Sequence, residues 1–131
     1  MLTDPISDYL TRVRNALAAE HPDVEVPASR LKKELSRILT EQGYITSFEV
    51  EPTAVGEVIK IQLKYTEDRK PVISGLRRIS RPGRRRYVAT TDVPRVQGGM
   101  GTSIVSTSSG VMTGHEAHAK GVGGEVVAYV W

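Results

Sequence analysis

Apolar residues near the N-terminus recur at the three- and four-residue spacing of an amphipathic helix. The positions concerned are Ile6, Leu10, Val13 and Leu17. Thr3 is the predicted N-cap, and Pro5 suits the opening turn because a proline there gives up no helical hydrogen bond. The pattern predicts a first helix with one face in a core.

A second stretch repeats this spacing between clear start and stop residues. Ser29 is placed to cap the helix, and Gly43 supplies the left-handed conformation that commonly ends one. Four apolar residues are expected to face a core: Leu31, Leu35, Ile38 and Leu39. The basic residues of the same helix are expected to stay outside: Arg30, Lys32, Lys33 and Arg37.

Alternation of apolar and polar residues follows. A short extended segment is expected at 24–27 and a strand at 44–50, and a turn at 53–56 leads into a strand at 58–65. Polar residues then dominate 66–71, where we predict a domain boundary.

Beyond the boundary the pattern is mainly that of short strands. They are expected at 72–79, 86–90, 103–107 and 126–131, with turns at 82–83, 92–94 and 98–99. A capping box formed by Thr113 and Glu116 predicts one short helix, which Gly121 can end. The predicted fold class is α+β with two small domains, an N-terminal α/β domain (1–65) and a mainly β C-terminal domain (66–131).

Charge divides the chain along the same line. Residues 1–65 hold eight basic and ten acidic residues, whereas residues 66–131 hold ten basic and five acidic ones. The window 69–95 carries nine basic residues, nearly all arginine, against the single acid Asp92. Such a field attracts polyanions, and the guanidinium fork suits phosphate groups. A solvated charged face is the alternative for a basic run taken alone.

The usual anchors of catalysis are missing. In His115-Glu116-Ala117-His118 the histidines are three residues apart, whereas the zinc motif needs four. The segment 106–110 ends like a nucleophile elbow, but position 106 is not glycine, and no phosphate-loop motif is present. The chain has no cysteine, no apolar run of membrane-spanning length and no secretion signal. We expect a cytoplasmic protein that is no enzyme, binds no metal or cofactor and contacts no membrane.

What remains suits RNA. The C-terminal half combines arginines with a hydroxyl-rich loop at 106–109 and a glycine cluster at 121–124, whose hydroxyls and amides can bond sugars, base edges and phosphates. Aromatic residues make up only 5% of the chain, which favours a folded RNA over single strands stacked on aromatic rings. DNA is less favoured, because the one basic helix face lies in the net-acidic half.

Five stretches, in order along the chain, resemble the bacterial small-subunit ribosomal protein S-eight family. They begin with Thr3-Asp4-Pro5-Ile6-Ser7-Asp8 and Arg12-Val13-Arg14-Asn15, and continue with Pro27-Ala28-Ser29-Arg30-Leu31-Lys32. The others are Gly75-Leu76-Arg77-Arg78-Ile79-Ser80-Arg81-Pro82-Gly83, Ser106-Thr107-Ser108-Ser109-Gly110-Val111-Met112-Thr113, and Gly121-Val122-Gly123-Gly124-Glu125 with terminal Tyr129-Val130-Trp131.

The resemblance implies a protein that binds the central domain of 16S rRNA and aids small-subunit assembly beside neighbouring small-subunit ribosomal proteins. It also implies possible repression of the protein's own operon mRNA and a monomeric state outside the ribosome. A general basic RNA-binding module is the alternative.

The resemblance further implies the contact residues. In the C-terminal domain they are Ser106, Thr107, Ser108, Gly123, Gly124 and Glu125, with Tyr87 nearby. The family often has a lysine where this chain has Ser109, and we expect Arg84, Arg85 and Arg86 to replace that phosphate contact. The N-terminal contacts are Asp4, Pro5, Arg14, Asn15, Ser29, Arg30, Lys32 and Lys60.

Several of these roles have plainer alternatives. The hydroxyls of residues 106–108 can serve a turn alone. Glu125 can accept hydrogen bonds from a base amino group or a sugar hydroxyl, or it can orient the hydroxyl-rich loop. Tyr87 and Trp131 can be core aromatics, and for Trp131 this is the preferred interpretation.

Overall fold

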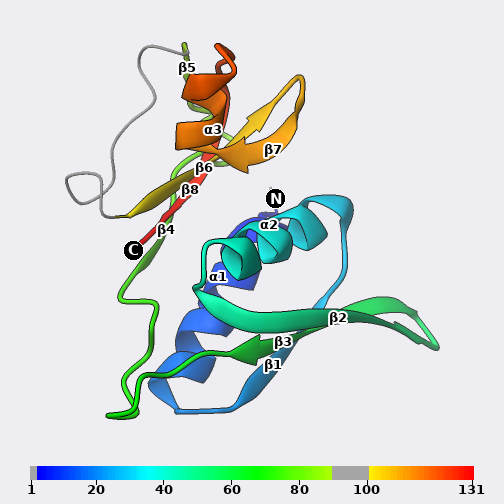
Figure 1. The fold of residues 1–131 in the computed structure, drawn as a ribbon. Coiled ribbons are helices and arrows are strands. Elements are labelled where there is room, and N and C mark those ends of the chain that lie inside the picture. Colours follow the sequence, from blue (N-terminus) through cyan, green and yellow to red (C-terminus); the bar gives the residue numbers. More distant parts are fainter. Residues whose placement is uncertain (1–2, 90–100) are drawn as a thin grey trace. The chain divides into compact units, whose positions relative to one another are not determined.

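A computed structural model describes residues 3–89 and 101–131, and its helices and strands are labelled in Figure 1. Contacts divide the chain into two compact units. We call Asp8–Ser74 the α/β unit, and Met1–Ser7 with Gly75–Trp131 the β-rich unit. The segment 66–71, where the sequence predicts a domain boundary, lies in the α/β unit, and Tyr65 pairs there with Pro71 in an isolated bridge. The domain boundary after residue 65 stays a prediction.

The α/β unit is built from two helices and a three-stranded antiparallel sheet. Its elements are α1 (Pro5–Ala18, whose first turn clusters with the other unit), β1 (Asp23–Pro27), α2 (Arg30–Glu41), β2 (Ile45–Thr53) and β3 (Gly56–Leu63). The strand order is β1-β3-β2. Both helices lie on one side of the sheet (Figure 1), and the core between them includes Leu10, Leu35, Ile38, Ile59 and Ile61.

The ends of α2 are as predicted, but the start of α1 is not. Ser29 caps α2 by accepting the Lys32 N–H, and Gly43 follows the helix with a φ of +79°. At α1 the cap is Asp4, whose carboxylate accepts the Ser7 N–H at 3.1 Å, so the prediction of Thr3 was wrong. Pro5 is the first helical residue, and this leaves the N-cap position to residue 4.

The prediction that Lys32 stays outside was also wrong. Lys32 is only 5% exposed, and its Nζ donates to the Pro27 carbonyl oxygen at 3.0 Å. The aliphatic stem can be buried because the charged end reaches a backbone acceptor. Leu31, expected in the core, is only half-buried.

The β-rich unit consists of short strands and one short helix. They are β4 (Leu76–Arg78), β5 (Tyr87–Val88), β6 (Thr102–Thr107), β7 (Gly110–Thr113), α3 (Gly114–Ala119) and β8 (Gly124–Val130). The sheet has the order β4-β8-β6-β7, and β5 pairs with β8. Its core includes Ile104, Val105, Met112, Val126 and Val130.

Most of this unit follows the predicted pattern. Thr113 caps α3 by accepting the Glu116 N–H, and Gly121 follows the helix with a φ of +67°. Strand β7 was not predicted, and only three residues of the strand expected at 72–79 pair in the sheet. The turns expected at 92–94 and 98–99 lie outside the described residues. The α+β fold class, with a mainly β unit that carries one short helix, is confirmed.

Candidate nucleic-acid interface

Three of the predicted contact residues lie side by side across the sheet of the β-rich unit. Glu125 on β8 is paired with Tyr87 on β5 and with Ser106 on β6. Residues directly opposite one another in antiparallel strands project from the same face of a sheet. We call Tyr87, Glu125 and Ser106 the polar row. Tyr87 is 70% exposed, so it is no core aromatic.

The two glycines before Glu125 allow the strands to approach closely. A Cβ on Gly124 would collide with the carbonyl oxygen of Ser106, and one on Gly123 would collide with that of Val88. Both obstacles are backbone atoms, which cannot turn aside as a flexible side chain can. The glycine pair therefore allows β8 to lie close to β5 and β6 at the level of the polar row.

The hydroxyl-rich loop is the tight turn between β6 and β7. The Thr107 hydroxyl donates to the Gly110 carbonyl oxygen at 2.8 Å and accepts the Ser109 N–H at 3.0 Å. The turn alternative is therefore correct for Thr107. In the described part of the chain, the hydroxyls of Ser106 and Ser108 have no hydrogen-bond partner, and Ser108 is exposed. Those two hydroxyls are available to a ligand.

Glu125 is held in place by two donors. The hydroxyl of Ser80 and the guanidinium of Arg85, at 2.9 Å, both donate to its Oε2. Burial alone would raise the pKa of Glu125, but the hydrogen bonds from Ser80 and Arg85 outweigh burial and lower that pKa. No partner for Oε1 is found among the described residues. One carboxylate oxygen is structural and the other can accept a hydrogen bond.

Ser80 was not singled out in the sequence. Its buried side chain also accepts the Arg86 N–H at 3.0 Å, and its N–H donates to the Val126 carbonyl oxygen at 3.0 Å. It therefore joins β8 to the stretch 81–86 that follows β4, which we call the arginine segment. No periodicity links Ser80 to Glu125, because they are 45 residues apart in the chain.

The arginines fall into two groups. Arg78 pairs with Asp4 at 3.1 Å and donates to the Val127 carbonyl oxygen at 2.7 Å, and its side chain is only 8% exposed. Arg85 pairs with Glu125. Within the described residues, Arg81, Arg84 and Arg86 are exposed and have no ion-pair partner. The three arginines expected to act as one set, at 84–86, are therefore not equivalent.

The contact residues expected in the α/β unit are less uniform. Arg14 and Asn15 on α1 and Arg30 on α2 are exposed, whereas the Ser29 hydroxyl is used as a helix cap. Lys32, as described, is buried.

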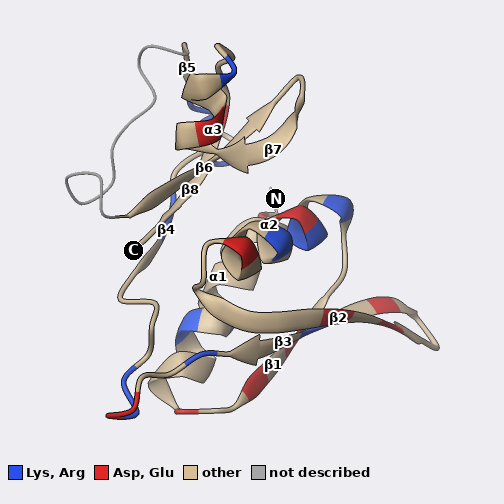
Figure 2. Cartoon of the chain, viewed as in Figure 1, with Lys and Arg blue, Asp and Glu red and all other residues tan. Residues whose placement is uncertain are grey.

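Lys60 lies among acids. On β3 it is paired with Glu25 on one side and Glu49 on the other, and its Nζ is 4.0 Å from the Asp23 carboxylate. Figure 2 shows acidic residues along β1 and β2. These carboxylates repel phosphate, so Lys60 is a weaker candidate for RNA than the exposed arginines.

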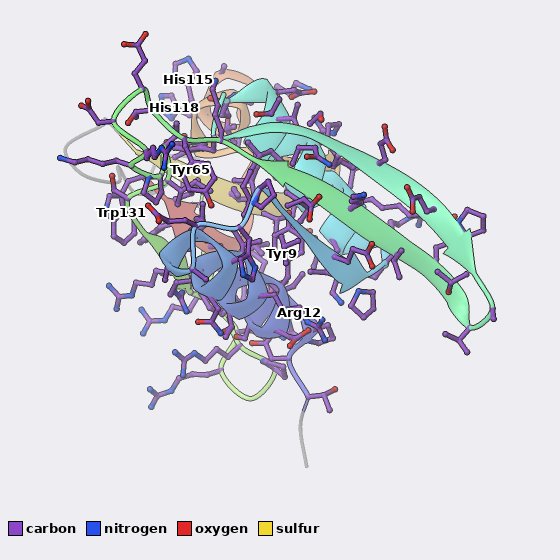
Figure 3. The ribbon with its side chains drawn as sticks, turned by 90° about the horizontal axis from the view of Figure 1, so that it is seen from below. Tyr9, Arg12, Tyr65, His115, His118 and Trp131 are labelled. Carbon is purple, nitrogen blue, oxygen red and sulfur yellow. The ribbon has the colours of Figure 1, made fainter. Side chains whose placement is uncertain are left out.

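His115 and His118 are exposed on α3 (Figure 3), and residues 3–89 and 101–131 contain no group of three or more His, Cys, Asp or Glu side chains that could hold a metal ion. None of the helices in these residues is long and apolar enough to cross a bilayer.

Comparison with known proteins agrees with these features. A family model described as Ribosomal protein S8 matches residues 4–131. The small ribosomal subunit protein uS8 of Solibacter usitatus is 56% identical over 131 residues and covers all of both chains. The uS8 proteins of Lactobacillus acidophilus and Flavobacterium johnsoniae are also 56% identical, over 131 and 132 residues, and cover the whole of this chain and 99% and 100% of their own. The chain belongs to the ribosomal protein S8 family.

Proposed function

We propose that the β-rich unit binds an irregular stem in the central domain of 16S rRNA and thereby aids assembly of the small subunit. As a member of the S8 family, the chain is a structural rRNA-binding component of the small ribosomal subunit and works there with rRNA and other ribosomal proteins. The family is one of structural proteins and is not known for enzymes. The observation that carries the proposal is the polar row, in which the Ser106 hydroxyl is free, together with the free hydroxyl of Ser108 in the following turn.

The polar row offers the groups that discriminate between RNAs. The Ser106 hydroxyl can donate to or accept from base edges and sugar 2′-OH groups, and Glu125 Oε1 can only accept. A free carboxylate oxygen rejects phosphate and favours a base amino group or a sugar hydroxyl. The exposed ring of Tyr87 adds a stacking surface next to it. This surface selects among RNAs by the donors and shapes they present.

The exposed arginines without an ion-pair partner among the described residues attract any RNA and do not distinguish one RNA from another. Arg84 and Arg86 lie next to the polar row in sequence and are free to meet phosphate groups, whereas Arg85 holds Glu125. Asp4 and Pro5, which belong to the β-rich unit, are proposed as contacts at the start of α1. In the α/β unit, Arg14, Asn15 and Arg30 are proposed as secondary contacts. Their contribution is expected to be smaller, because that unit carries many carboxylates.

Binding to a 16S central-domain stem, compared with an unrelated stem of equal length, tests the proposal. Replacing Ser106 and Ser108 by alanine is expected to weaken the cognate stem selectively by roughly tenfold, since two hydrogen bonds are lost. Replacing Arg84 and Arg86 by glutamine is expected to weaken both stems and flatten the salt dependence. Ser47→Ala, on the other sheet, is the control. Equal affinity of the wild-type chain for both stems would contradict specific binding and leave a general basic RNA-binding module.

The same surface would accept an mRNA stem of similar shape. We propose that the chain represses its own operon by binding such a stem, and that it is monomeric outside the ribosome. Competition between the rRNA stem and the operon mRNA for one site is the expected result. Simultaneous binding of both RNAs would contradict a shared surface.

A further inference from the structure

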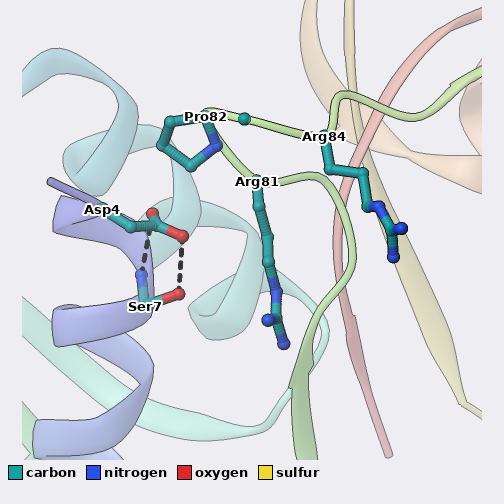
Figure 4. Close-up of a pocket in the computed structure, with 6 residues that line it drawn as sticks. Asp4, Ser7, Arg81, Pro82 and Arg84 are labelled. Carbon is teal, nitrogen blue, oxygen red and sulfur yellow. Dashed lines mark hydrogen bonds between the residues drawn. The ribbon is translucent and has the colours of Figure 1, made fainter. Parts of the chain in front are cut away.

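A hollow with a volume of about 480 Å³ lies beside the arginine segment of the β-rich unit (Figure 4). Its lining comes from two stretches that cluster in this unit: Asp4, Ser7, Arg81, Pro82, Gly83 and Arg84. We call this hollow the notch. In Figure 4 the side chains of Arg81 and Arg84 both extend away from the turn that joins them.

The backbone holds these two arginines opposite each other. The Arg81 N–H donates to the Arg84 carbonyl oxygen at 3.2 Å, and the Arg84 N–H donates to that of Arg81 at 2.8 Å. Pro82 and Gly83 form the two-residue turn between them. Like charges directly opposite in a hairpin repel, and among the described residues neither guanidinium has a carboxylate partner. An anion bound by both would relieve this repulsion.

Asp4 does not cancel these charges, although it lines the notch. Its carboxylate pairs with Arg78 and accepts the N–H and the hydroxyl of Ser7, at 3.1 and 2.6 Å. Burial alone would raise the pKa of Asp4, but the hydrogen bonds from Ser7 and Arg78 lower it, so the group is ionised and already satisfied. Because Asp4 caps α1, the helix end is not the binding group. The two arginines must supply the attraction.

We propose that the notch binds one phosphodiester group of the rRNA stem, held by the guanidinium groups of Arg81 and Arg84. This inference rests on the proposed function and names a contact of that surface. The guanidinium fork donates two parallel hydrogen bonds to phosphate oxygens. A volume of about 480 Å³ also leaves room for the attached ribose. A bound phosphate would offset the repulsion between the arginines, so the pair favours binding over the stability of the turn.

The test measures binding of the cognate stem across a range of salt concentrations by Arg81→Gln and Arg84→Gln. Each substitution is expected to reduce affinity roughly tenfold and to lower the salt slope by about one. The matched control is Arg77→Gln, an exposed arginine of β4 that does not line the notch. Melting of the free variants separates binding from folding: Arg81→Gln and Arg84→Gln should melt at or above the wild-type temperature, because each removes a like-charge pair.

Methylphosphonate substitution at successive positions of the stem locates the phosphate. A methylphosphonate at one position is expected to weaken binding by the wild-type chain and by Arg77→Gln. The same substitution should leave the affinities of Arg81→Gln and Arg84→Gln unchanged. Titration with inorganic phosphate, followed through the arginine side-chain NMR signals, shows whether the notch binds free phosphate or only a phosphate group of RNA. A saturable shift at Arg81 and Arg84 shows that the notch also takes free phosphate, whereas a shift with RNA only assigns it to the phosphodiester chain.

Two results would contradict the proposed phosphate site in the notch. One is an equal loss of affinity in Arg81→Gln, Arg84→Gln and Arg77→Gln, which would reduce the arginines to a general field. The other is a methylphosphonate pattern that is unchanged in the two notch variants. Both results count against the phosphate site only if the wild-type chain prefers the cognate stem. If the wild-type chain shows no preference, it is the proposed function that fails.

Discussion

Two hairpin turns, one in each unit, share one design and carry different side chains. In residues 53–56 and in residues 107–110, the hydroxyl of a leading threonine donates to the carbonyl oxygen of a closing glycine at 2.8 Å. The same hydroxyl accepts the N–H of the third residue, at 3.3 and 3.0 Å, and the glycines have φ angles of +121° and +111°. The residues between are Ala54-Val55 in the first turn and Ser108-Ser109 in the second.

The comparison shows which residues make a turn and which are free for function. Threonine and glycine fix the backbone in both places, so the two middle residues are not constrained by folding. In the α/β unit they leave Val55 97% exposed, next to Glu57, whereas in the β-rich unit they place serine hydroxyls beside the polar row. The second turn therefore presents hydroxyls for the proposed RNA contacts at positions that the turn itself leaves free.

The largest contrast is expected at Gly124, for which the first hairpin has no counterpart. In Gly124→Ala the new Cβ would meet the backbone of Ser106 and Thr107, so β6 and β8 must separate. We expect a loss of about 3 kcal/mol in the free energy of unfolding, as for an overpacked core. Urea unfolding measures it. A loss below about 1 kcal/mol would show that the two strands part easily and that the glycine is not required for their approach.

The closing glycines come next, and here the two turns should behave alike. In both, open space surrounds the position, so Gly56→Ala and Gly110→Ala are strained only by the positive φ. Each is expected to lose about 1 to 2 kcal/mol. Only Gly110→Ala should also weaken binding to the rRNA stem. Unequal stability losses would contradict the shared design, and equal binding losses would contradict the different roles.

A smaller effect on stability at low pH is expected to distinguish Glu125 from Glu57, the acidic residues near the two turns. The lowered pKa of Glu125 means that its contribution to stability is present above its ordinary pKa of 4.5 and is lost as the pH falls through the folded-state pKa. Acidification should therefore lower the free energy of unfolding of Glu125→Gln less than that of the wild-type chain. The difference should be less than about 1 kcal/mol, because Arg85 is partly exposed.

Glu57→Gln is the matched control for this measurement. Its pair with Lys33, at 2.9 Å, is more exposed and should contribute little. Acid unfolding followed by circular dichroism compares the two variants. The same acid profile in both would show that the bonds from Ser80 and Arg85 do not stabilise the carboxylate.

Local patterns were sufficient for much of the fold. Ser29, Gly43 and the Thr113 cap were predicted because each acts on neighbours within four residues. The sequence also contained a signal for the correct start of α1, because a proline in the first helical position leaves the N-cap to Asp4. The burial of Lys32 was missed because its partner, Pro27, belongs to the preceding strand.

The contact residues stay predictions, and their division into structural and free groups was not predicted. The resemblance to the S8 family named Ser106, Thr107 and Glu125, but it could not show that Thr107 closes a turn while the Ser106 hydroxyl has no hydrogen-bond partner among the described residues. The Ser80 contact with Glu125 and the pairing of Arg78 with Asp4 join residues 45 and 74 positions apart. Contacts of this kind leave no periodicity, so the separation of structural from free arginines needed the structure.

The smallest effect on stability is expected when the middle residues of the two turns are exchanged. One variant carries Ser108→Ala with Ser109→Val, and the other carries Ala54→Ser with Val55→Ser. Because threonine and glycine make the turns, both variants should unfold within about 0.5 kcal/mol of the wild-type chain. Only the first should lose affinity for the cognate stem, by several-fold and with an unchanged salt slope, since no charge is removed. If the second variant lost affinity as well, the tip of the first hairpin would be part of the RNA surface, and the contrast between the two turns would not hold.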